Sequence, residues 1–297
     1  MINNDTSIEN ICTSQVNYYN MVDKRHYQFT RPQGHETRGK TARNRLRRVD
    51  NFVLMYTKSL LQKRFSKYRN VFVDVGYGEY PFTTIESAQR FHGVNKDLYI
   101  VGVEIDKERV LKASSFQKEH VDFRHGGFNL PLCEQSERAS VIRAFNVLRQ
   151  YEKKQVTKAY SAMLPYLTEG GILIEGTSDP LGRIWVANLF RKHHVCLQQE
   201  AVVFSTNFRC EFHPQNFQTV LPKNYIECVV AGEKMHDFFC GWKEAYRQSL
   251  YLRNWGERQI FQKSIALLAE SGYPVNSCKK YTSRGYLILY VNDEKYV

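Results

Sequence analysis

The sequence predicts an α/β fold, a mostly parallel sheet of seven strands with helices on both faces. A basic N-terminal helix is expected before this sheet, and a C-terminal helical elaboration after it. Two observations carry the prediction. Short apolar runs alternate with amphipathic patterns of helix length, as in βαβ units whose right-handed crossovers place helices on either face of a parallel sheet. A glycine-rich turn follows the first apolar run, which is typical of a strand that leads into a helix at a ligand-binding edge.

The expected strands are short apolar runs, and the expected helices are longer segments whose apolar residues recur every three or four positions. The strands are expected at residues 71–75, 98–104, 121–124, 140–145, 171–177, 195–204 and 286–290. The helices are expected at about residues 40–64, 81–92, 107–118, 152–167, 182–192, 234–248 and 257–271.

These patterns divide the chain into four parts. Residues 1–37 lack hydrophobic periodicity and are interpreted as a tail or arm, whose removal is expected to leave ligand binding intact. Residues 38–69 form the predicted basic amphipathic helix, and residues 70–207 form the predicted core. Residues 208–297 are expected to hold a helical insertion and a closing strand.

The composition is that of an ordinary globular chain of 297 residues, with 42% hydrophobic and 24% charged residues. No apolar run approaches the roughly 20 residues needed to cross a bilayer, and the polar start of the chain lacks the pattern of a signal peptide. The seven cysteines include no Cys-x-x-Cys pair, so neither a zinc site nor a disulfide framework is expected. We expect a cytoplasmic protein that has no metal and no membrane partner.

The net charge of +12 is unevenly distributed along the chain. Residues 1–69 hold 14 Lys and Arg against 5 Asp and Glu, a net charge of +9, whereas the remainder holds 28 against 25, a net charge of +3. The run from Arg38 to Arg48 contains six cations and no anion. Such asymmetry is typical of a chain that meets an anionic partner, or of a solubilising tail.

The first predicted strand ends in an acidic residue followed by two glycines, Asp74, Gly76 and Gly78. Glycine lets the backbone turn tightly and approach a ligand without a Cβ atom in the way. The helix that follows directs its N-terminal N–H groups to the same point. A dinucleotide fingerprint would need a third glycine where Pro81 stands. The carboxylate suits the ammonium of an amino acid better than a pyrophosphate.

The second strand ends at Glu104, 26 residues after Gly78. A carboxylate at this place can accept hydrogen bonds from both hydroxyls of a ribose. Asp106 is better placed to cap the next helix and is given that structural role. The two neighbouring strand tips therefore predict a site for an amino-acid nucleoside.

With these residues, the segment 70–205 resembles the class I S-adenosylmethionine-dependent methyltransferases, which have a Rossmann-like fold. The family's first motif, acidic-x-Gly-x-Gly-x-Gly, is matched up to Gly78 and departs at Tyr80, where a third glycine is common. In the family the acidic end of the second strand holds the ribose, and Glu104 matches it. The resemblance implies S-adenosyl-L-methionine as the cofactor and methyl transfer as the activity.

Later strand ends supply the other residues that the resemblance implies. Gly127 stands where the family usually has Asp, and Phe128 is placed to cover the purine. Asn146 matches the position at which the family meets the donor and begins its acceptor site. The implied cofactor-binding residues are Asp74, Gly76, Tyr77, Gly78, Glu104, Ile105, Gly127, Phe128 and Asn146.

Methyl transfer from a sulfonium needs alignment more than covalent assistance, because the donor carries its own leaving group. The catalytic residue is unknown from the sequence, with Asn146 and Tyr151 as candidates. Arg149 and Glu175 are the candidate substrate-binding residues. Arg143, inside an otherwise apolar strand, needs a partner if it is buried, and a structural ion pair is expected there.

The sequence leaves the methyl acceptor open. A small molecule is favoured, because the segment after residue 207 offers aromatic side chains that can cover a binding site. The alternative is an RNA methyltransferase that uses the basic N-terminal segment, although that segment has no aromatic residues interleaved for base stacking. A third possibility is an inactive module that binds S-adenosylmethionine without transferring the methyl group.

Overall fold

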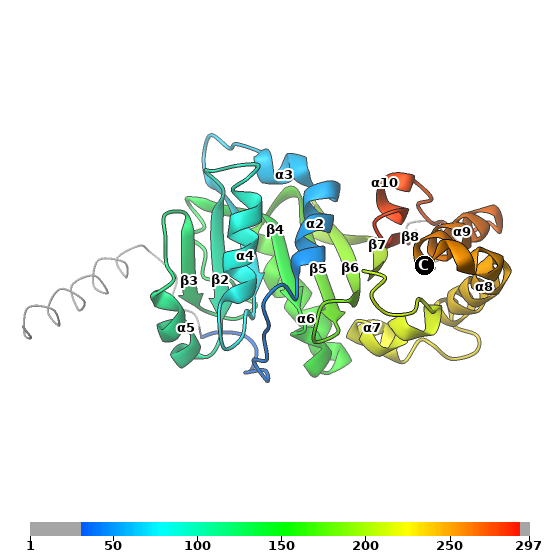
Figure 1. Cartoon of the computed structure of the whole chain (residues 1–297). Coiled ribbons are helices and arrows are strands. Elements are labelled where there is room, and N and C mark those ends of the chain that lie inside the picture. The colour runs from blue at the N-terminus through cyan, green and yellow to red at the C-terminus, as the bar shows by residue number, and fades with distance from the viewer. Residues whose placement is uncertain (1–30, 292–297) are drawn as a thin grey trace, which may run out of the picture.

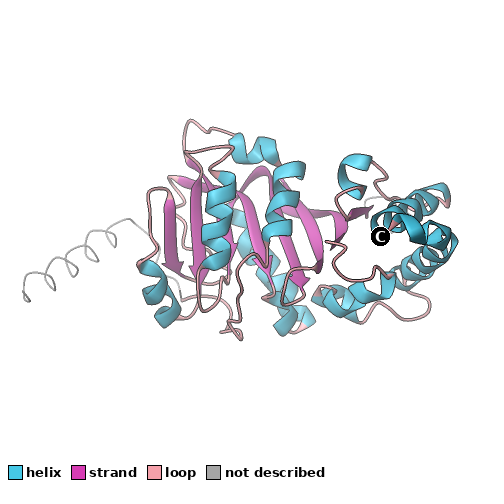
Figure 2. Cartoon of the chain, in the orientation of Figure 1, coloured by secondary structure: helices cyan, strands magenta, loops and turns pink. Residues whose placement is uncertain are grey.

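The computed structural model describes residues 31–291 and contains one eight-stranded sheet (Figures 1 and 2). Its strand order is β3-β2-β1-β4-β5-β6-β7-β8. The strands are β1 (Arg69–Val75), β2 (Tyr99–Glu104), β3 (Val121–His125), β4 (Glu137–Phe145), β5 (Leu167–Ser178), β6 (Ile184–His193), β7 (Cys196–Thr206) and β8 (Tyr286–Tyr290).

The first five strands form a parallel, doubly wound half-sheet. The pairs β1–β2, β2–β3, β1–β4 and β4–β5 are all parallel, and the order reverses between β1 and β4. In sheets of this kind, ligands bind outside the carboxyl ends of the strands at this switch point. The predicted Rossmann-like α/β fold is therefore confirmed.

The other three strands extend the sheet by antiparallel pairing, which makes eight strands rather than the predicted seven. The helix predicted at residues 182–192 is wrong, because this segment is β6. Trp185 and Leu189 pack into the core on one face of the sheet, and Val186 and Phe190 pack on the other. Since both faces are apolar, the sequence lacks the alternation of apolar and polar residues that marks a half-buried strand. Its pattern is then the same as that of a buried helix.

The helices lie between and after the strands. In the first half they are α2 (Arg47–Tyr56), α3 (Lys58–Gln62), α4 (Phe82–Phe91), α5 (Lys107–Ser114) and α6 (Lys153–Met163), with the short 3-10 helices η1 (Leu148–Gln150) and η2 (Leu164–Tyr166). In the second half they are α7 (Lys223–Ile226), α8 (Lys234–Ser249), α9 (Glu257–Glu270) and α10 (Lys279–Thr282), with η3 (Pro214–Val220) and η4 (Leu250–Trp255).

Helices cover both faces of the sheet, as predicted. Phe72 of β1 belongs to the apolar cluster beneath α2 and α4, where its ring lies 4.8 Å from that of Phe91. Its neighbour Val73 belongs to the cluster with Met163 of α6 on the opposite face. A third cluster, around Trp242, joins α8 and α9 to β6, β7 and β8 at the far end of the sheet (Figure 1). No helix within residues 31–291 is long and apolar enough to span a bilayer.

The predicted N-terminal helix begins later than expected. Gly39 and Asn44 have φ angles of +65° and +60°, which interrupt a helix, and α2 starts only at Arg47. Residues 33–45, which we call the strap, instead run as an irregular segment along the carboxyl edge of the parallel strands (the dark blue segment in Figure 1). The strap thus places part of the predicted arm and part of the predicted helix at the edge where ligands bind in this fold.

Candidate functional site

The glycine loop after β1 and the end of β2 form the centre of the edge. Gly76 and Gly78 have φ angles of +70° and +87°, in the region that favours glycine. The Gly78 N–H donates to Oε2 of Glu104 at 2.9 Å, and the N–H of Ile105 donates to Oε1 at 2.9 Å. Glu104 is buried, and these two hydrogen bonds fix its carboxylate at the strand tip.

Asp74 lies below this loop and has partners within the protein. Its Oδ2 accepts hydrogen bonds from the hydroxyls of Thr83 and Thr84 at 2.7 and 2.8 Å. Its Oδ1 accepts from Nε of Arg143 at 3.1 Å, and a second guanidinium nitrogen lies 2.8 Å from Oδ2. The same guanidinium pairs with Asp50 of α2. Asp74 therefore ties the strand end to α4 and β4, and Arg143 has the structural ion pair that was expected.

Tyr77 points into the interior rather than along the edge. Its side chain is 3% exposed, its ring lies edge-on to Phe123, and its hydroxyl has no hydrogen-bond partner among the described residues. Burial, together with the nearby carboxylates of Glu104 and Asp74, raises the pKa of this phenol. The hydroxyl therefore remains protonated and available as a donor beside Glu104.

The loop after β3 touches the strap directly. The Phe128 N–H donates to the Gln33 carbonyl at 2.9 Å, and the Gln33 N–H donates to Oδ1 of Asn129 at 2.6 Å. A Cβ atom on Gly127 would lie 2.0 Å from the Gln33 carbonyl oxygen, a distance that no side chain can occupy. The absence of a side chain at Gly127 is therefore explained by the close approach of the strap.

Asn146, the first residue after β4, joins two strand ends. Its φ angle is +62°, its Oδ1 accepts from the Ser178 N–H at 2.9 Å, and its Nδ2 donates to the Ser178 hydroxyl at 3.2 Å. Arg45 of the strap donates to the same hydroxyl at 3.1 Å. Asn146 thus lies at the switch-point side of the edge, half-buried and in contact with the end of β5.

Tyr151 and Arg149 hold the loop after β4 to other segments. The Tyr151 hydroxyl accepts from the His35 N–H and donates to the His35 carbonyl, both at 2.8 Å, and the two rings stack 3.8 Å apart. Phe128 lies edge-on to Tyr151 at 5.3 Å. Arg149 donates to the Thr219 carbonyl of η3. Tyr151 therefore belongs to the edge, whereas Arg149 faces the C-terminal elaboration.

Glu175 lies away from the other candidates, under α6. Its Oε2 accepts from the Tyr160 hydroxyl and from Nδ2 of Asn188, each at 2.9 Å, while Oε1 has no partner among the described residues. Burial raises the pKa of this carboxyl to about 7. Gln199 continues the polar chain, because its amide donates to Oδ1 of Asn188 and to the Tyr225 hydroxyl, each at 2.8 Å.

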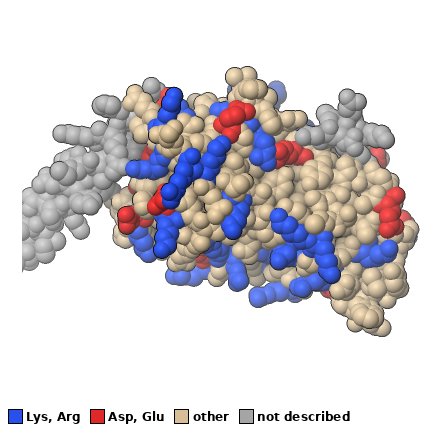
Figure 3. All heavy atoms as spheres, turned by 90° about the horizontal axis from the view of Figure 1, so that it is seen from above, with Lys and Arg blue, Asp and Glu red and all other residues tan. Residues whose placement is uncertain are grey.

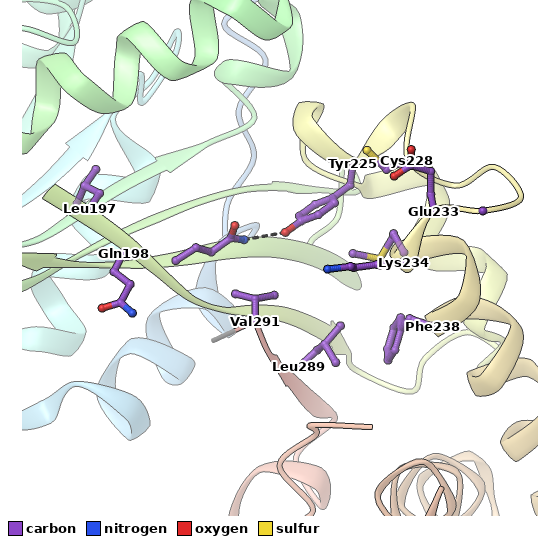
Figure 4. Close-up of a pocket in the computed structure, with 12 residues that line it drawn as sticks. Leu197, Gln198, Tyr225, Cys228, Glu233, Lys234, Phe238, Leu289 and Val291 are labelled. Carbon is purple, nitrogen blue, oxygen red and sulfur yellow. Dashed lines mark hydrogen bonds between the residues drawn. The ribbon is translucent and has the colours of Figure 1, made fainter. Parts of the chain in front are cut away.

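The end of this chain forms one wall of a cavity of about 710 Å³ between β7, β8, α7 and the start of α8. Figure 4 shows the Tyr225 hydroxyl and the Lys234 side chain directed into it, with the Gln199–Tyr225 hydrogen bond as a dashed line. Apolar side chains such as Phe238 and Leu289 form other parts of the wall. Hydrogen bonds thus link Glu175 to the wall of this cavity rather than to the carboxyl edge.

The structure brings most of the predicted cofactor residues to one edge: Gly76, Gly78, Glu104, Ile105, Gly127, Phe128 and Asn146. Tyr77 and Asp74 lie just beneath it, and Glu175 lies elsewhere. Sequence reasoning did not find the strap residues at this edge. The available signals were the glycines of the strap, Gly34 and Gly39, whose φ angles of +123° and +65° favour glycine.

Comparison with known proteins gives likenesses in structure alone. No family model matches the sequence, and a search of curated proteins finds no match. Similar solved structures include the DszA carbon methyltransferase, with 13% identity and a TM-score of 0.37 over 45% of this chain and 35% of that one. The N-methyltransferase NodS from Bradyrhizobium japonicum WM9 has 16% identity and a TM-score of 0.32 over 44% of this chain and 67% of NodS.

A further similar structure is the plantazolicin methyltransferase BamL in complex with a triazolic desmethylPZN analog and SAH. It has 12% identity and a TM-score of 0.35, over 46% of this chain and 47% of BamL. This chain thus spans less than half of both BamL and DszA.

Proposed function

We propose that the chain binds S-adenosylmethionine at the carboxyl edge and transfers its methyl group to an acceptor. The observation that carries this proposal is the pairing of the glycine loop with the buried carboxylate of Glu104. Oε2 of Glu104 accepts one hydrogen bond, from the Gly78 N–H, and so keeps an acceptor position for a ligand hydroxyl. Gly76 and Gly78 form a sharp turn beside Glu104 with positive φ angles, and the places of their missing Cβ atoms lie against Val147 and Gly39.

The other edge residues suit the remaining parts of such a donor. Phe128 offers an aromatic face for a purine, and the side chain of Asn146 is positioned by Ser178 at the switch point. Asp74 takes an indirect role, because its oxygens hold Arg143, Thr83 and Thr84. It fixes the strand end that carries the loop.

The bound donor would supply an activated methyl group, and the protein would supply alignment. Reacting atoms held in line gain most of their rate advantage from orientation rather than from covalent help. Asn146, the candidate at the switch point, would orient the acceptor through the second hydrogen of Nδ2, because Oδ1 and the first Nδ2 hydrogen already bond to Ser178. Tyr151 would instead hold the neighbouring loop, because its hydroxyl is already engaged by His35.

We favour a small molecule as the acceptor. The cavity of about 710 Å³ has the size of a small-ligand site and combines apolar walls with a few placed polar groups. Glu175 is linked to it through Asn188, Gln199 and Tyr225. Because both lie apart from the carboxyl edge, we place the accepting atom beside Asn146 and not in this cavity. The basic run from Arg38 to Arg48 supports RNA less well, since Arg45 and Arg48 donate to protein oxygens.

The decisive experiment is calorimetric titration with S-adenosylhomocysteine, the demethylated product, and with S-adenosylmethionine. Glu104→Ala should lower the affinity about tenfold to a hundredfold, the usual effect of losing a hydrogen bond to a charged group, about 1.5–3 kcal/mol. Glu108→Ala, which removes an exposed carboxylate from the first turn of α5, should change nothing. Absence of binding in the unmodified chain would remove the proposal.

A further inference from the structure

We infer that the strap is the second wall of the donor site, so that the donor lies enclosed between the strap and the sheet edge. The inference rests on the proposed function. It adds that donor exchange requires the strap to move, and that residues outside every motif found in the sequence help to hold the donor.

The strap contacts the loop that follows each of the five parallel strands. Its partners there are Glu79 after β1, Arg109 after β2, Phe128 and Asn129 after β3, Gln150 and Tyr151 after β4, and Ser178 and Asp179 at the end of β5. A segment that merely crossed the surface would not be expected to meet every loop. The contacts show that the strap follows the ligand-binding edge along its length.

The seat of the strap is shaped by glycines that permit backbone contact. A Cβ atom on Gly78 would lie 2.5 Å from the carbonyl oxygen of Gly39. A Cβ atom on Gly182, in the turn between β5 and β6, would lie 1.9 Å from the carbonyl oxygen of Arg45. Gly182 belongs to no cofactor motif of the sequence; its φ angle of +64° favours glycine in this turn, and its lack of a side chain admits the strap.

Three buried polar atoms at or beside this junction lack hydrogen-bond partners within residues 31–291: Oγ1 of Thr41, the hydroxyl of Tyr77 and Nη1 of Arg109. Nη1 of Arg109 lies 3.6 Å from Oε1 of Glu104, which is an ion pair without a hydrogen bond. Buried polar groups in folded proteins nearly always have partners. A ligand rich in hydroxyl, amine and carboxylate groups would provide a partner for Nη1 of Arg109 beside Glu104.

The two ends of the strap are fastened differently. The end near α2 is held by the Arg45 guanidinium, which donates to Ser178, Asp179 and Lys40. α2 itself is fixed by the buried pair of Asp50 and Arg143. The other end, at Gln33, is exposed and held mainly through its backbone. Opening for donor exchange would therefore start at Gln33 and leave Arg45 as the anchor.

The first test uses the full chain and limited trypsin digestion, because Arg38, Lys40 and Arg43 of the strap are exposed. Saturating S-adenosylhomocysteine should slow cleavage after these residues about tenfold or more, since an enclosed ligand holds the strap closed. Cleavage after the exposed Arg253 of η4 is the internal control and should not change. Unchanged cleavage of the strap with ligand bound would overturn the inference.

The second test replaces the anchor. Arg45→Ala should weaken S-adenosylhomocysteine binding about fivefold or more and speed tryptic cleavage of the strap, because charged hydrogen bonds are lost. The matched control is Arg47→Ala, which removes an exposed arginine with no side-chain bond among the described residues. Equal affinities in the two variants would overturn the strap's role while leaving the proposed function intact. Failure of the unmodified chain to bind would instead refute the proposed function.

Discussion

Replacing Arg143 should strongly lower the free energy of unfolding. Its side chain is completely buried, and the guanidinium lies between the carboxylates of Asp50 and Asp74. Removing one partner of a buried ion pair leaves an uncompensated charge, which typically costs about 3–5 kcal/mol. Arg143→Met should lower the free energy of unfolding by about this amount, as measured by urea denaturation.

A surface ion pair provides the control for this variant. Arg64 and Asp97 lie 2.9 Å apart, with side chains 84% and 65% exposed, and such pairs contribute about 0–1 kcal/mol. Arg64→Met should therefore change stability little. Adding Asp50→Asn and Asp74→Asn to Arg143→Met should recover part of the loss. Equal effects of the Arg143 and Arg64 variants would show that the buried network is not strongly coupled to folding.

Glu175 should make stability depend on pH. Burial raises its pKa to about 7 from the ordinary value of 4.5. The folded chain therefore binds a proton that the unfolded chain has lost between these two values, and stability falls as pH rises through this window. Glu175→Gln keeps an acceptor for Tyr160 and Asn188 without the charge. It should raise the free energy of unfolding at about pH 8 by roughly 1–3 kcal/mol.

The measurement is urea denaturation at several pH values between about 5 and 8. The Glu175→Gln chain should show a flatter dependence on pH than the unmodified chain. Glu227→Gln, at an exposed position after α7, serves as the control and should leave the dependence as it is. The same slope in the Glu175 variant and the unmodified chain would mean that Glu175 is ionised in the folded protein across this range.

The residues at the strand tips were predictable because their signals are local. An acidic residue followed by glycines, and a carboxylate at the next strand end, are visible within short stretches of sequence. The partner of Asp74 was not predictable in the same way, because Arg143 lies 69 residues further along the chain. The strap contacts the edge largely through backbone carbonyls, such as those of Gln33 and Gly39, and a backbone contact has no side-chain signature.

Among the elements, the sequence predicted the five parallel strands and also β7 and β8 of the antiparallel extension, but not β6. Strands β1 to β5 fall on the predicted apolar runs. The amphipathic helix between two such runs makes the limits of each strand visible in the sequence. β6 was taken for a helix because Trp185, Val186, Leu189 and Phe190 fill both of its faces. The spacing of apolar residues distinguishes a strand from a helix only where one face of the element is polar.

The strap changes what we expect for ligand binding when the N-terminal arm is removed. Removing residues 1–37 was expected to leave ligand binding intact, yet His35 and Gln33 contact Tyr151 and Phe128. We now expect a chain that lacks residues 1–37 to bind S-adenosylhomocysteine about tenfold more weakly, because the strap loses its free end and several hydrogen bonds.

The control for this truncation is a chain that lacks only residues 1–30, which keeps the whole strap. Calorimetry compares the three chains, and circular dichroism verifies that each is folded. Equal affinity in the two truncated chains would mean that residues 31–37 cover the edge without contributing to the site.

For the whole molecule, the net charge of +12 raises the question of an RNA acceptor. Basic side chains gather in several groups on the side where α3 lies (Figure 3), whereas the strap lies at the opposite, carboxyl edge (Figure 1). Within the basic run, Arg43 stacks on Phe82, and Arg45 and Arg48 donate to protein oxygens. Part of the positive charge therefore lies on the side away from the candidate site, and part of the basic run is engaged with the protein itself.

This distribution predicts that a mixed-sequence RNA binds only non-specifically, with a Kd of about 10⁻⁴–10⁻⁶ M at physiological salt and a strong salt dependence. Replacing Arg38, Lys40 and Arg43 together by Gln should change that Kd by less than about threefold, because other cations supply the attraction. Fluorescence anisotropy with a labelled RNA measures both quantities. Submicromolar binding that disappears in the triple variant would identify the strap as an RNA contact and make RNA, rather than a small molecule, the acceptor to pursue.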